Sequence, residues 1–337
     1  MTGETGTVSC GVERTITSKE MSLTKNQIKY IRSLELKKNR RAEGVFLAEG
    51  PKVVGDLLGR FPCRLLAGTR EWLRHLPPCL ADNGTQAGAT DPPHRITSLE
   101  VAQVHRHRRK DDQVPHYAQM DYPPHYEMDG HTPRYGIDEV VEVSEDELRR
   151  ASLLKTPQQV LALFEQPTEP ADWTAPHHEL CLALDGVQDP GNLGTIVRLA
   201  DWFGIRHVYC SPGTVDAYSP KVIQATMGSI ARVSVSYVPL PDLIAGHTPS
   251  AEWRGDMPVY GTFLDGGDLY QTELSDHGLL VMGNEGNGIS TEVARLVSHR
   301  IRIPAYPAGR ADAPDSLNVA IATAIVCAEW RRRAALR

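Results

Sequence analysis

Residues 185–205, DGVQDPGNLGTIVRLADWFGI, decide the fold class of the C-terminal half of this chain. The apolar run ELCLAL precedes them, and a loop rich in Asp, Pro and Gly then leads into apolar residues at helical spacing. Pro190 and Gly191 favour a tight turn, and Asn192 is of a residue type that caps helices. Arg198 follows on the opening turns, where a guanidinium can bind a phosphate or a carboxylate. A capped helix with a surface arginine fits the same letters.

The rest of the C-terminal half repeats this alternation of apolar strand and helix. Strands are predicted over residues 179–186, 207–213, 232–238, 258–266, 278–288 and 299–306, and helices over 192–204, 219–230, 289–298 and 316–333. Continuous apolar strands separated by helices are typical of a mostly parallel sheet with both faces covered. Ligands bind such sheets at the carboxyl ends of the strands, so the loops that follow the strands are the candidate site.

A smaller α/β domain is predicted over residues 19–168, after a disordered segment at 1–18. We expect a helix at residues 22–44, a strand at 45–50, a helix at 51–61 and strands at 64–68, 140–143 and 159–165. Ser144 and Glu147 form a capping box that predicts a further helix. A Pro- and His-rich insertion is expected at about 77–137, a linker at 169–179 and the second domain at 180–337. His105 and His107 of the insertion lack partners at metal-ligand spacing, so no metal site is predicted.

The composition is that of an ordinary globular protein, with 41% hydrophobic and 23% charged residues among 337. No apolar run approaches the roughly 20 residues that span a bilayer, and the first residues lack the apolar core of a secretory signal. We therefore expect a cytoplasmic protein without a membrane segment. The six cysteines form no CxxC pair and are expected to be free thiols. The net charge of −6 opposes general nucleic-acid affinity. The basic residues among 19–41 and 331–333 fit a local phosphate-binding surface, and charge alone supports a solvated helix face equally well.

The stretch LLVMGNEGNGIS, residues 279–290, is a second cluster at a strand end. Gly283, Gly286 and Gly288 let a ligand approach the backbone closely, and Glu285 lies between them. The stretch is not the GxGxxG of a first βαβ unit, and the chain has no P-loop motif. A solvent-exposed Glu285 in a glycine turn is an equally good interpretation of these letters alone.

The stretch RIPAYPAGRADAPDSLNVAIATAI, residues 302–325, is the third cluster. Ile303 ends a predicted strand, and Ser316 is a natural N-cap for the helix that follows. Asn318 is expected one turn inside this apolar helix, where its amide needs a hydrogen-bond partner.

Taken together, DPGNLGTIVRLADWFG, VMGNEGNGIS and IPA…DSLNVAIATAI resemble, in order and separation, the three motifs of the SpoU family of RNA ribose 2′-O-methyltransferases, over about residues 180–333. The runs IKYIRSLELKKNRRAEGVFLAEGPKVV and KTPQQVLALF resemble the small RNA-binding domain that precedes many members. The resemblance implies an α/β fold with a SPOUT-type parallel sheet whose C-terminal chain forms a deep trefoil knot. It also implies S-adenosyl-L-methionine as cofactor and a homodimer with the active site near the interface. The segment between Ile303 and Ser316 is longer than is usual in the family.

The resemblance implies roles for individual residues as well. The implied active-site set is Asn192, Arg198, Glu285, Ser316 and Asn318, and the implied cofactor contacts are Gly283, Ile303 and Leu317. In the implied transfer of a methyl group to a ribose 2′-hydroxyl, Arg198 is either the base or, because arginine stays protonated, a clamp on a phosphate or on the developing alkoxide. Ribosomal RNA is favoured over transfer RNA as substrate. A tRNA methyltransferase, a non-catalytic RNA-binding protein and a nucleotide-dependent enzyme are the alternatives.

Overall fold

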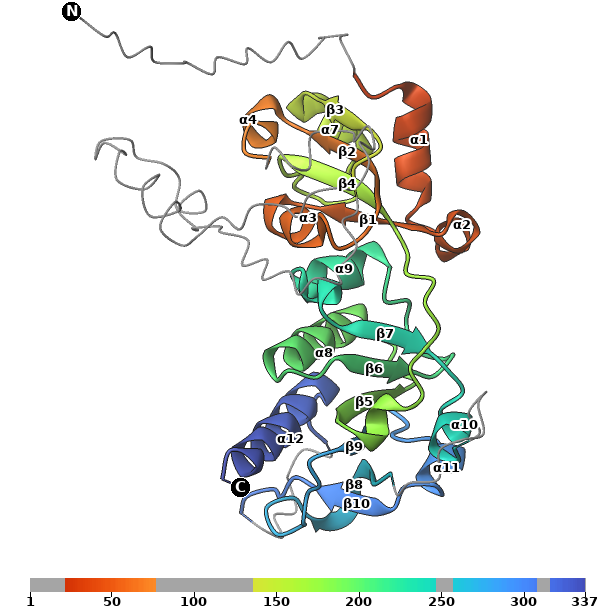
Figure 1. Cartoon of the computed structure of the whole chain (residues 1–337), viewed down its shortest axis with the longest axis vertical. Helices are drawn as coiled ribbons and strands as arrows, with labels where there is room; N and C mark the ends of the chain where they lie inside the picture. Colours follow the sequence, from red (N-terminus) through yellow and green to blue (C-terminus); the bar gives the residue numbers. More distant parts are fainter. Residues whose placement is uncertain (1–21, 77–135, 247–256, 308–315, 337) are drawn as a thin grey trace, which may run out of the picture.

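The computed structural model describes residues 22–76, 136–246, 257–307 and 316–336. Figure 1 shows two β-sheets along the long axis of this part of the molecule, a four-stranded sheet built from the N-terminal half and a six-stranded sheet built from the C-terminal half. The predicted disorder at residues 1–18, nearly all of the predicted insertion with His105 and His107, and most of the 304–315 loop lie outside the described residues.

The four-stranded sheet has the order β1-β4-β2-β3. Its strands are β1 (Val45–Glu49), β2 (Cys63–Gly68), β3 (Val140–Glu142) and β4 (Val160–Glu165). β4 is antiparallel to both β1 and β2, whereas β2 and β3 are parallel. The last of these strands in the chain therefore separates the first two. Every residue of β1 is buried, which explains the apolar run of its first four residues, before Glu49.

Within the described residues, five helices accompany this sheet: α1 (Lys25–Ser33), α2 (Lys37–Glu43), α3 (Pro51–Leu57), α4 (Arg70–Leu73) and α7 (Glu145–Ala151). The single helix predicted at residues 22–44 is wrong, because the chain turns between α1 and α2. Arg40 of α2 holds that turn, since its guanidinium donates to the backbone oxygens of Leu34 and Glu35 at 2.6 and 2.7 Å. These oxygens lie where α1 ends and have no partner within a helix. The capping box at the start of α7 is confirmed.

The six-stranded sheet has the order β10-β8-β9-β5-β6-β7, and all neighbouring strands are parallel. Its strands are β5 (Leu180–Asp185), β6 (His207–Cys210), β7 (Ser234–Tyr237), β8 (Val259–Asp268), β9 (Gly278–Gly283) and β10 (His299–Arg302). The predicted parallel sheet is thereby confirmed. The deep trefoil knot stays a prediction.

Helices cover both faces of this sheet. They are α8 (Pro190–Trp202), α9 (Pro220–Thr226), α10 (Leu240–Ile244), α11 (Thr291–Ala294) and α12 (Val319–Ala334), with 3-10 turns at η3 (Ala175–His177) and η4 (Ser229–Ala231). In Figure 1, α8 and α12 pack together on one side, and α10 and α11 on the other. α8 and α9 approach closely at Gly194, where a Cβ would lie 2.4 Å from the Cβ of Ala225. Among the helices of the described ranges, none combines the length and the apolar character needed to cross a bilayer.

The two sheets share one continuous core and are held together by specific contacts. The rings of Phe46 on β1 and Tyr218 next to α9 have centroids 5.1 Å apart. The side chains of Arg40 and Asp216, only 3% and 13% exposed, form an ion pair of 2.5 Å between Nη2 and Oδ2. The small sheet is therefore fixed against the loop that joins β6 to α9.

The loops that follow β5 and β9 begin side by side. Asp185 and Gly283 are the last register pair of the parallel β5–β9 ladder. From β5 the chain continues through α8 to β6 on one side, and from β9 through α11 to β10 on the other. In α/β sheets, ligands bind outside the carboxyl ends of strands at the point where neighbouring connections diverge in this way.

Candidate active site

Three amide and carboxylate side chains from distant parts of the sequence form one hydrogen-bonded chain. Asn192 Nδ2 donates to Glu285 Oε1 at 2.9 Å. Asn318 Nδ2 donates to Asn192 Oδ1, also at 2.9 Å. The two bonds fix the orientation of the Asn192 amide, because its nitrogen and its oxygen each have an assigned partner. The structure thus joins one predicted site residue from each of the three sequence clusters.

The loop before α8 is organised by Asp189, not by Asn192 as predicted. Asp189 is the N-cap, and its Oδ1 accepts the backbone N–H of Asn192 at 2.8 Å. The helix begins at Pro190, because proline at the first helical position lacks an N–H that would otherwise be unpaired. Asn192 therefore lies within the first turn. Its side chain is released from capping and is available to Glu285.

The glycine loop after β9 is held by Asn284. Its Oδ1 accepts the backbone N–H groups of Gly286 and Asn287, both at 2.9 Å. Its Nδ2 donates to the backbone oxygen of Gly186, in the loop after β5, at 2.7 Å. One side chain thus shapes the turn that carries Glu285 and ties it to the neighbouring loop.

The start of α12 differs from the prediction. Asn318 is the N-cap of the helix, and its Oδ1 accepts the backbone N–H groups of Ala320 and Ile321 at 2.9 and 3.3 Å. Asn318 is exposed and does not lie one turn inside a buried helix. Ser316, predicted as the N-cap, is two residues outside the helix and exposed, without a side-chain hydrogen bond to any described residue. Asn318 therefore takes the capping position that was predicted for Ser316. Its amide nitrogen also donates to Asn192.

Arg198 lies on the exposed side of α8 and is not part of this hydrogen-bonded chain. Six residues of an α-helix separate it from Asn192 by about 9 Å along the axis and by about one third of a turn around it. Within the described ranges, its guanidinium has no ion-pair or hydrogen-bond partner. A permanently charged group left free in this way is available to an anionic ligand.

The predicted cofactor contacts lie around the same strand ends. Gly283 packs tightly, since a Cβ there would lie 2.3 Å from the carbonyl carbon of Gly288. At Gly288, whose φ is +68°, the position of a Cβ has no atom within 4 Å. Ile303 is half-buried against the core behind β10, and Leu317 is 50% exposed just before α12. The loops therefore offer open backbone and apolar surface, which suit a nucleoside better than a metal ion.

Other catalytic chemistries find no support in the described part of the chain. Burial raises the pKa values of the Cys63 and Cys327 thiols to about 12, and it raises those of Cys181 and Cys210 as well, so none is a thiolate at neutral pH. No group of three or more His, Cys, Asp or Glu side chains within the described ranges could hold a metal ion.

Sequence reasoning missed Asp189, Asn284 and the pairing of Asp185 with Ser290. Asp185 Oδ2 accepts the backbone N–H of Ser290 at 2.8 Å and so closes the glycine loop from the other end. A usable signal existed for Asn284, because an Asn two residues before a Gly at a strand end is typical of an Asx turn. No signal existed for Asp185, whose partner is distant in the sequence.

Comparison with known proteins gives matches on both halves of the chain. The model of the SpoU rRNA Methylase family matches residues 179–328, and that of the MRM3-like substrate binding domain matches residues 25–107. The 23S rRNA (guanosine(2553)-2′-O)-methyltransferase RlmP of Bacillus subtilis (strain 168) is 36% identical over 186 residues, which cover 55% of this chain and 69% of RlmP.

Solved structures also resemble this chain over most of its length. A Porphyromonas gingivalis protein assigned to the TrmH family of RNA methyltransferases is 39% identical, with a TM-score of 0.67, and the match covers 92% of this chain and 99% of that one. An AdoMet-bound rRNA methyltransferase from Sinorhizobium meliloti is 30% identical, with a TM-score of 0.62, and the match covers 93% and 97%.

Proposed function

The chain belongs to the SpoU rRNA methylase family, and from this premise we propose that it transfers the methyl group of S-adenosyl-L-methionine to a ribose 2′-hydroxyl of ribosomal RNA. The observation that carries the proposal is the hydrogen-bonded chain of Asn318, Asn192 and Glu285, which brings the three sequence clusters to one place. The names of RlmP and of the Sinorhizobium meliloti structure support rRNA as substrate and S-adenosyl-L-methionine as cofactor.

S-adenosyl-L-methionine, when bound, supplies an electrophilic methyl group on a sulfonium. The residues that would hold it are Gly283, through the backbone of its loop, and Ile303 and Leu317, through apolar surface. The ribose is oriented by Asn192, whose amide is itself held by Glu285 and Asn318. Ser316, exposed beside this chain of bonds, contributes a hydroxyl to the ribose. Holding two reacting groups in line supplies much of the rate enhancement in such transfers.

Arg198 is assigned to the RNA. Arginine side chains carry a permanent charge, and this one is free of partners among the described residues, so it is suited to clamp the neighbouring phosphate or the developing 2′-alkoxide. Stabilising that alkoxide lowers the cost of losing the 2′-hydroxyl proton. A role for Arg198 as the base requires a neutral guanidine and is the less favourable alternative.

The deciding experiment is transfer of labelled methyl from S-adenosyl-L-methionine to RNA from a strain that lacks the gene, followed by mapping of the 2′-O-methyl site. We expect label on one ribosomal RNA nucleotide and none on the same RNA from the parent strain. Label on transfer RNA alone would contradict the rRNA assignment. Binding of the cofactor without transfer to any RNA would point to a non-catalytic RNA-binding protein.

A homodimer is part of the proposal. Leu317 and Ile321 are 50% and 52% exposed at the start of α12, beside Asn318. Large apolar side chains gathered on a surface next to a site are typical of an interface. Light scattering should give twice the mass of the 37.2 kDa chain, and Ile321→Asp should give the monomer mass. A monomer in the unaltered protein would contradict this.

The small sheet and its helices are proposed to bind the RNA, in keeping with the match to a substrate binding domain at residues 25–107. The exposed Lys37, Lys38 and Arg41 of α2 suit RNA phosphates. A cytoplasmic location also stays a proposal. It is supported by the four described cysteines, which are all free, as is typical of a reducing compartment.

A further inference from the structure

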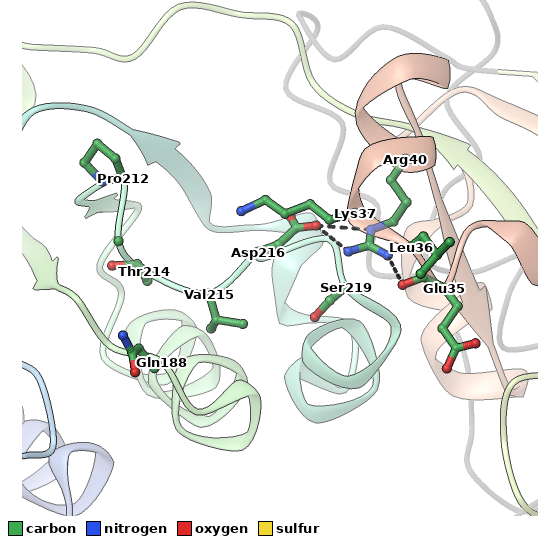
Figure 2. Close-up of a pocket in the computed structure, with 11 residues that line it drawn as sticks. Glu35, Leu36, Lys37, Arg40, Gln188, Pro212, Thr214, Val215, Asp216 and Ser219 are labelled. Carbon is green, nitrogen blue, oxygen red and sulfur yellow. Dashed lines mark hydrogen bonds and ion pairs between the residues drawn. The ribbon is translucent and has the colours of Figure 1, made fainter.

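A hollow of about 460 Å³ lies between the small sheet and the six-stranded sheet. Figure 2 shows α2 on one side of it and, on the other, the loop between β6 and α9 together with the loop before α8. Its volume lies within the range of sites for small organic groups, which is roughly 300–1,000 Å³. None of the residues assigned above to catalysis or to the cofactor lines it.

The wall between the two sheets is firmly held. Arg40 Nε and Nη2 donate to the same oxygen of Asp216 at 3.1 and 2.5 Å, as drawn in Figure 2. Nη1 of Arg40 is used by two backbone oxygens of the α1–α2 turn. Because this buried ion pair spans the two sheets, the hollow has a fixed shape and does not depend on a ligand to form it.

The lining combines an apolar surface with an unused polar group. Leu36 is 52% exposed at one lip, and Pro212 and Val215 lie opposite. Ser219 Oγ is closed to solvent, so it does not face the hollow, and it has no hydrogen-bond partner among the described residues. The side-chain amide of Gln188 is exposed and has no hydrogen bond within the described ranges, so a ligand with donors and acceptors on its edge could bind it.

Charge favours an RNA ligand. Lys37 extends from α2 toward the loop that carries Pro212 and Asp216 (Figure 2), and its ammonium has no ion pair with a described residue. Lys38 and Arg41 are exposed on the same helix. An apolar cleft with hydrogen-bonding groups inside and cations outside matches a base with its phosphate.

Gln188 connects the hollow with the active site. Its side chain lines the hollow, while its backbone N–H donates to Glu285 Oε2 at 3.5 Å. It also lies four positions before Asn192, in the loop that leads into α8. A group bound in the hollow is therefore one short loop away from the ribose site.

We propose that the hollow receives an unstacked nucleobase of the RNA strand, close to the ribose that is methylated, and so contributes to the choice of nucleotide. Leu36 and Val215 pack on the faces of the base, the Gln188 side chain hydrogen bonds to its edge, and Lys37 binds its phosphate. Protein sites that are specific for single-stranded RNA read splayed-out bases in this manner. The assignment rests on the proposed function, because it presumes an RNA ligand.

The test compares the affinity for two single-stranded RNA oligomers of equal length, one with bases and one abasic, measured by fluorescence anisotropy. The variant is Leu36→Ala with Gln188→Ala, and the matched control is Lys38→Ala on the same helix as Leu36. We expect the unaltered protein to bind the oligomer with bases more tightly than the abasic one. In the variant, the ratio of the two affinities should fall about tenfold, which is the size of one base contact. Lys38→Ala should lower the affinity for both oligomers equally, because it removes only a phosphate contact.

An unchanged preference in the variant would overturn the assignment. So would a loss of S-adenosyl-L-methionine affinity with RNA preference intact, since the hollow would then belong to the cofactor. Leu36 and Gln188 are exposed, and the Gln188 side chain has no partner among the described residues, so the variant should fold. If the melting temperature of the double variant falls, Leu36→Ala alone is used. If the proposed function itself is wrong, the unaltered protein will transfer no methyl group to RNA. That outcome is distinct from the two results that overturn the assignment of the hollow.

Discussion

Asn192 and Glu285 are 93 residues apart in the sequence, yet a hydrogen bond of 2.9 Å joins Nδ2 of the first to Oε1 of the second. The bond is possible because β5 and β9 are neighbouring parallel strands whose last register pair is Asp185 with Gly283. Asn318 then completes the chain from the start of α12. The amide of Asn192 is therefore orientated before any substrate arrives, which is the condition for catalysis by positioning.

Asn318 serves both as a helix cap and as a donor, and two substitutions separate these roles. Asn318→Asp keeps a capping oxygen but cannot donate to Asn192, so we expect near-normal stability and a loss of methyl transfer of about tenfold or more. Asn318→Ala removes both and should also lower the free energy of unfolding by about 1 kcal/mol. Urea denaturation and single-turnover transfer rates measure the two effects. Normal transfer by Asn318→Asp would refute the positioning role.

Glu285 holds the amide of Asn192 and the backbone N–H of Gln188. Glu285→Gln keeps one accepting oxygen, so we expect a modest loss of transfer rate. Glu285→Ala leaves the Asn192 amide unheld and should cost about 10²-fold, the size of a lost preorganised contact. The residue is exposed, so melting temperatures should stay close to that of the unaltered protein. Equal rates for the two variants would contradict this order.

Arg198 should matter for transfer and not for folding. Because it is exposed and unpartnered in the described part of the chain, Arg198→Ala should change the free energy of unfolding by no more than about 0.5 kcal/mol. Transfer should fall by about 10²- to 10³-fold. Arg198→Lys should restore part of the rate, since lysine keeps the charge but not the fork of donors. The control is Arg295→Ala, an exposed arginine after α11. Equal effects at the two positions would contradict the assignment.

The glycine loop provides a matched pair of substitutions. A Cβ at Gly283 would lie 2.3 Å from the carbonyl carbon of Gly288 and 2.4 Å from the backbone nitrogen of Ile289, so Gly283→Ala must displace the loop. A Cβ at Gly286 would have its nearest neighbour, Asn284 Oδ1, at 3.6 Å. We expect Gly283→Ala to weaken S-adenosyl-L-methionine binding strongly and to lower the melting temperature, and Gly286→Ala to keep the melting temperature. Calorimetric titration and thermal unfolding check both, and a Gly283→Ala protein with normal affinity would contradict the cofactor assignment.

Glu49 gives a pH dependence of stability. Burial raises the pKa of its carboxyl above the ordinary 4.5. The hydrogen bonds from Ser152 and from the backbone N–H of Leu153, and the charge of Arg32, each lower the pKa but do not outweigh burial. Below pH 4.5 the group is protonated in both states and costs nothing. As the pH rises through 4.5 and then through the raised folded value, the unfolded state ionises first, so the contribution of this group to stability is lost.

Glu49→Gln should remove this loss, because an amide does not ionise. The free energy of unfolding of Glu49→Gln, relative to the unaltered protein, is expected to rise between about pH 4 and pH 7. Urea titrations across this range measure it. Glu145→Gln, at an exposed position on α7, is the control and should leave the difference flat. A flat difference for Glu49→Gln would mean that the carboxyl is not penalised by burial.

The elements of the six-stranded sheet were predictable from short-range patterns. Apolar runs such as that of β5, which is buried along its whole length, can be recognised in the sequence because each strand is covered on both faces. The ends of the helices were harder to predict. Asp189 and Asn192 are both good capping residues, and only the backbone path shows that Asp189 accepts the N–H of Asn192. Ser316 and Asn318 are likewise both good capping residues, and only the structure shows that Asn318 caps α12.

The sequence by itself determined the parallel α/β sheet and the family, because apolar periodicity and three motifs in order are local properties of the chain. Only the tertiary structure decided which motif residues meet. Asn192, Glu285 and Asn318 join because β5 lies beside β9 and α8 packs on α12, whereas Arg198 is exposed on α8 and makes no hydrogen bond to them. The hollow lined by Gln188 could not be predicted from the sequence either, because the Arg40–Asp216 ion pair at its wall joins residues that are 176 positions apart in the sequence. Pairings of that kind depend on how the sheets pack, which no local pattern encodes.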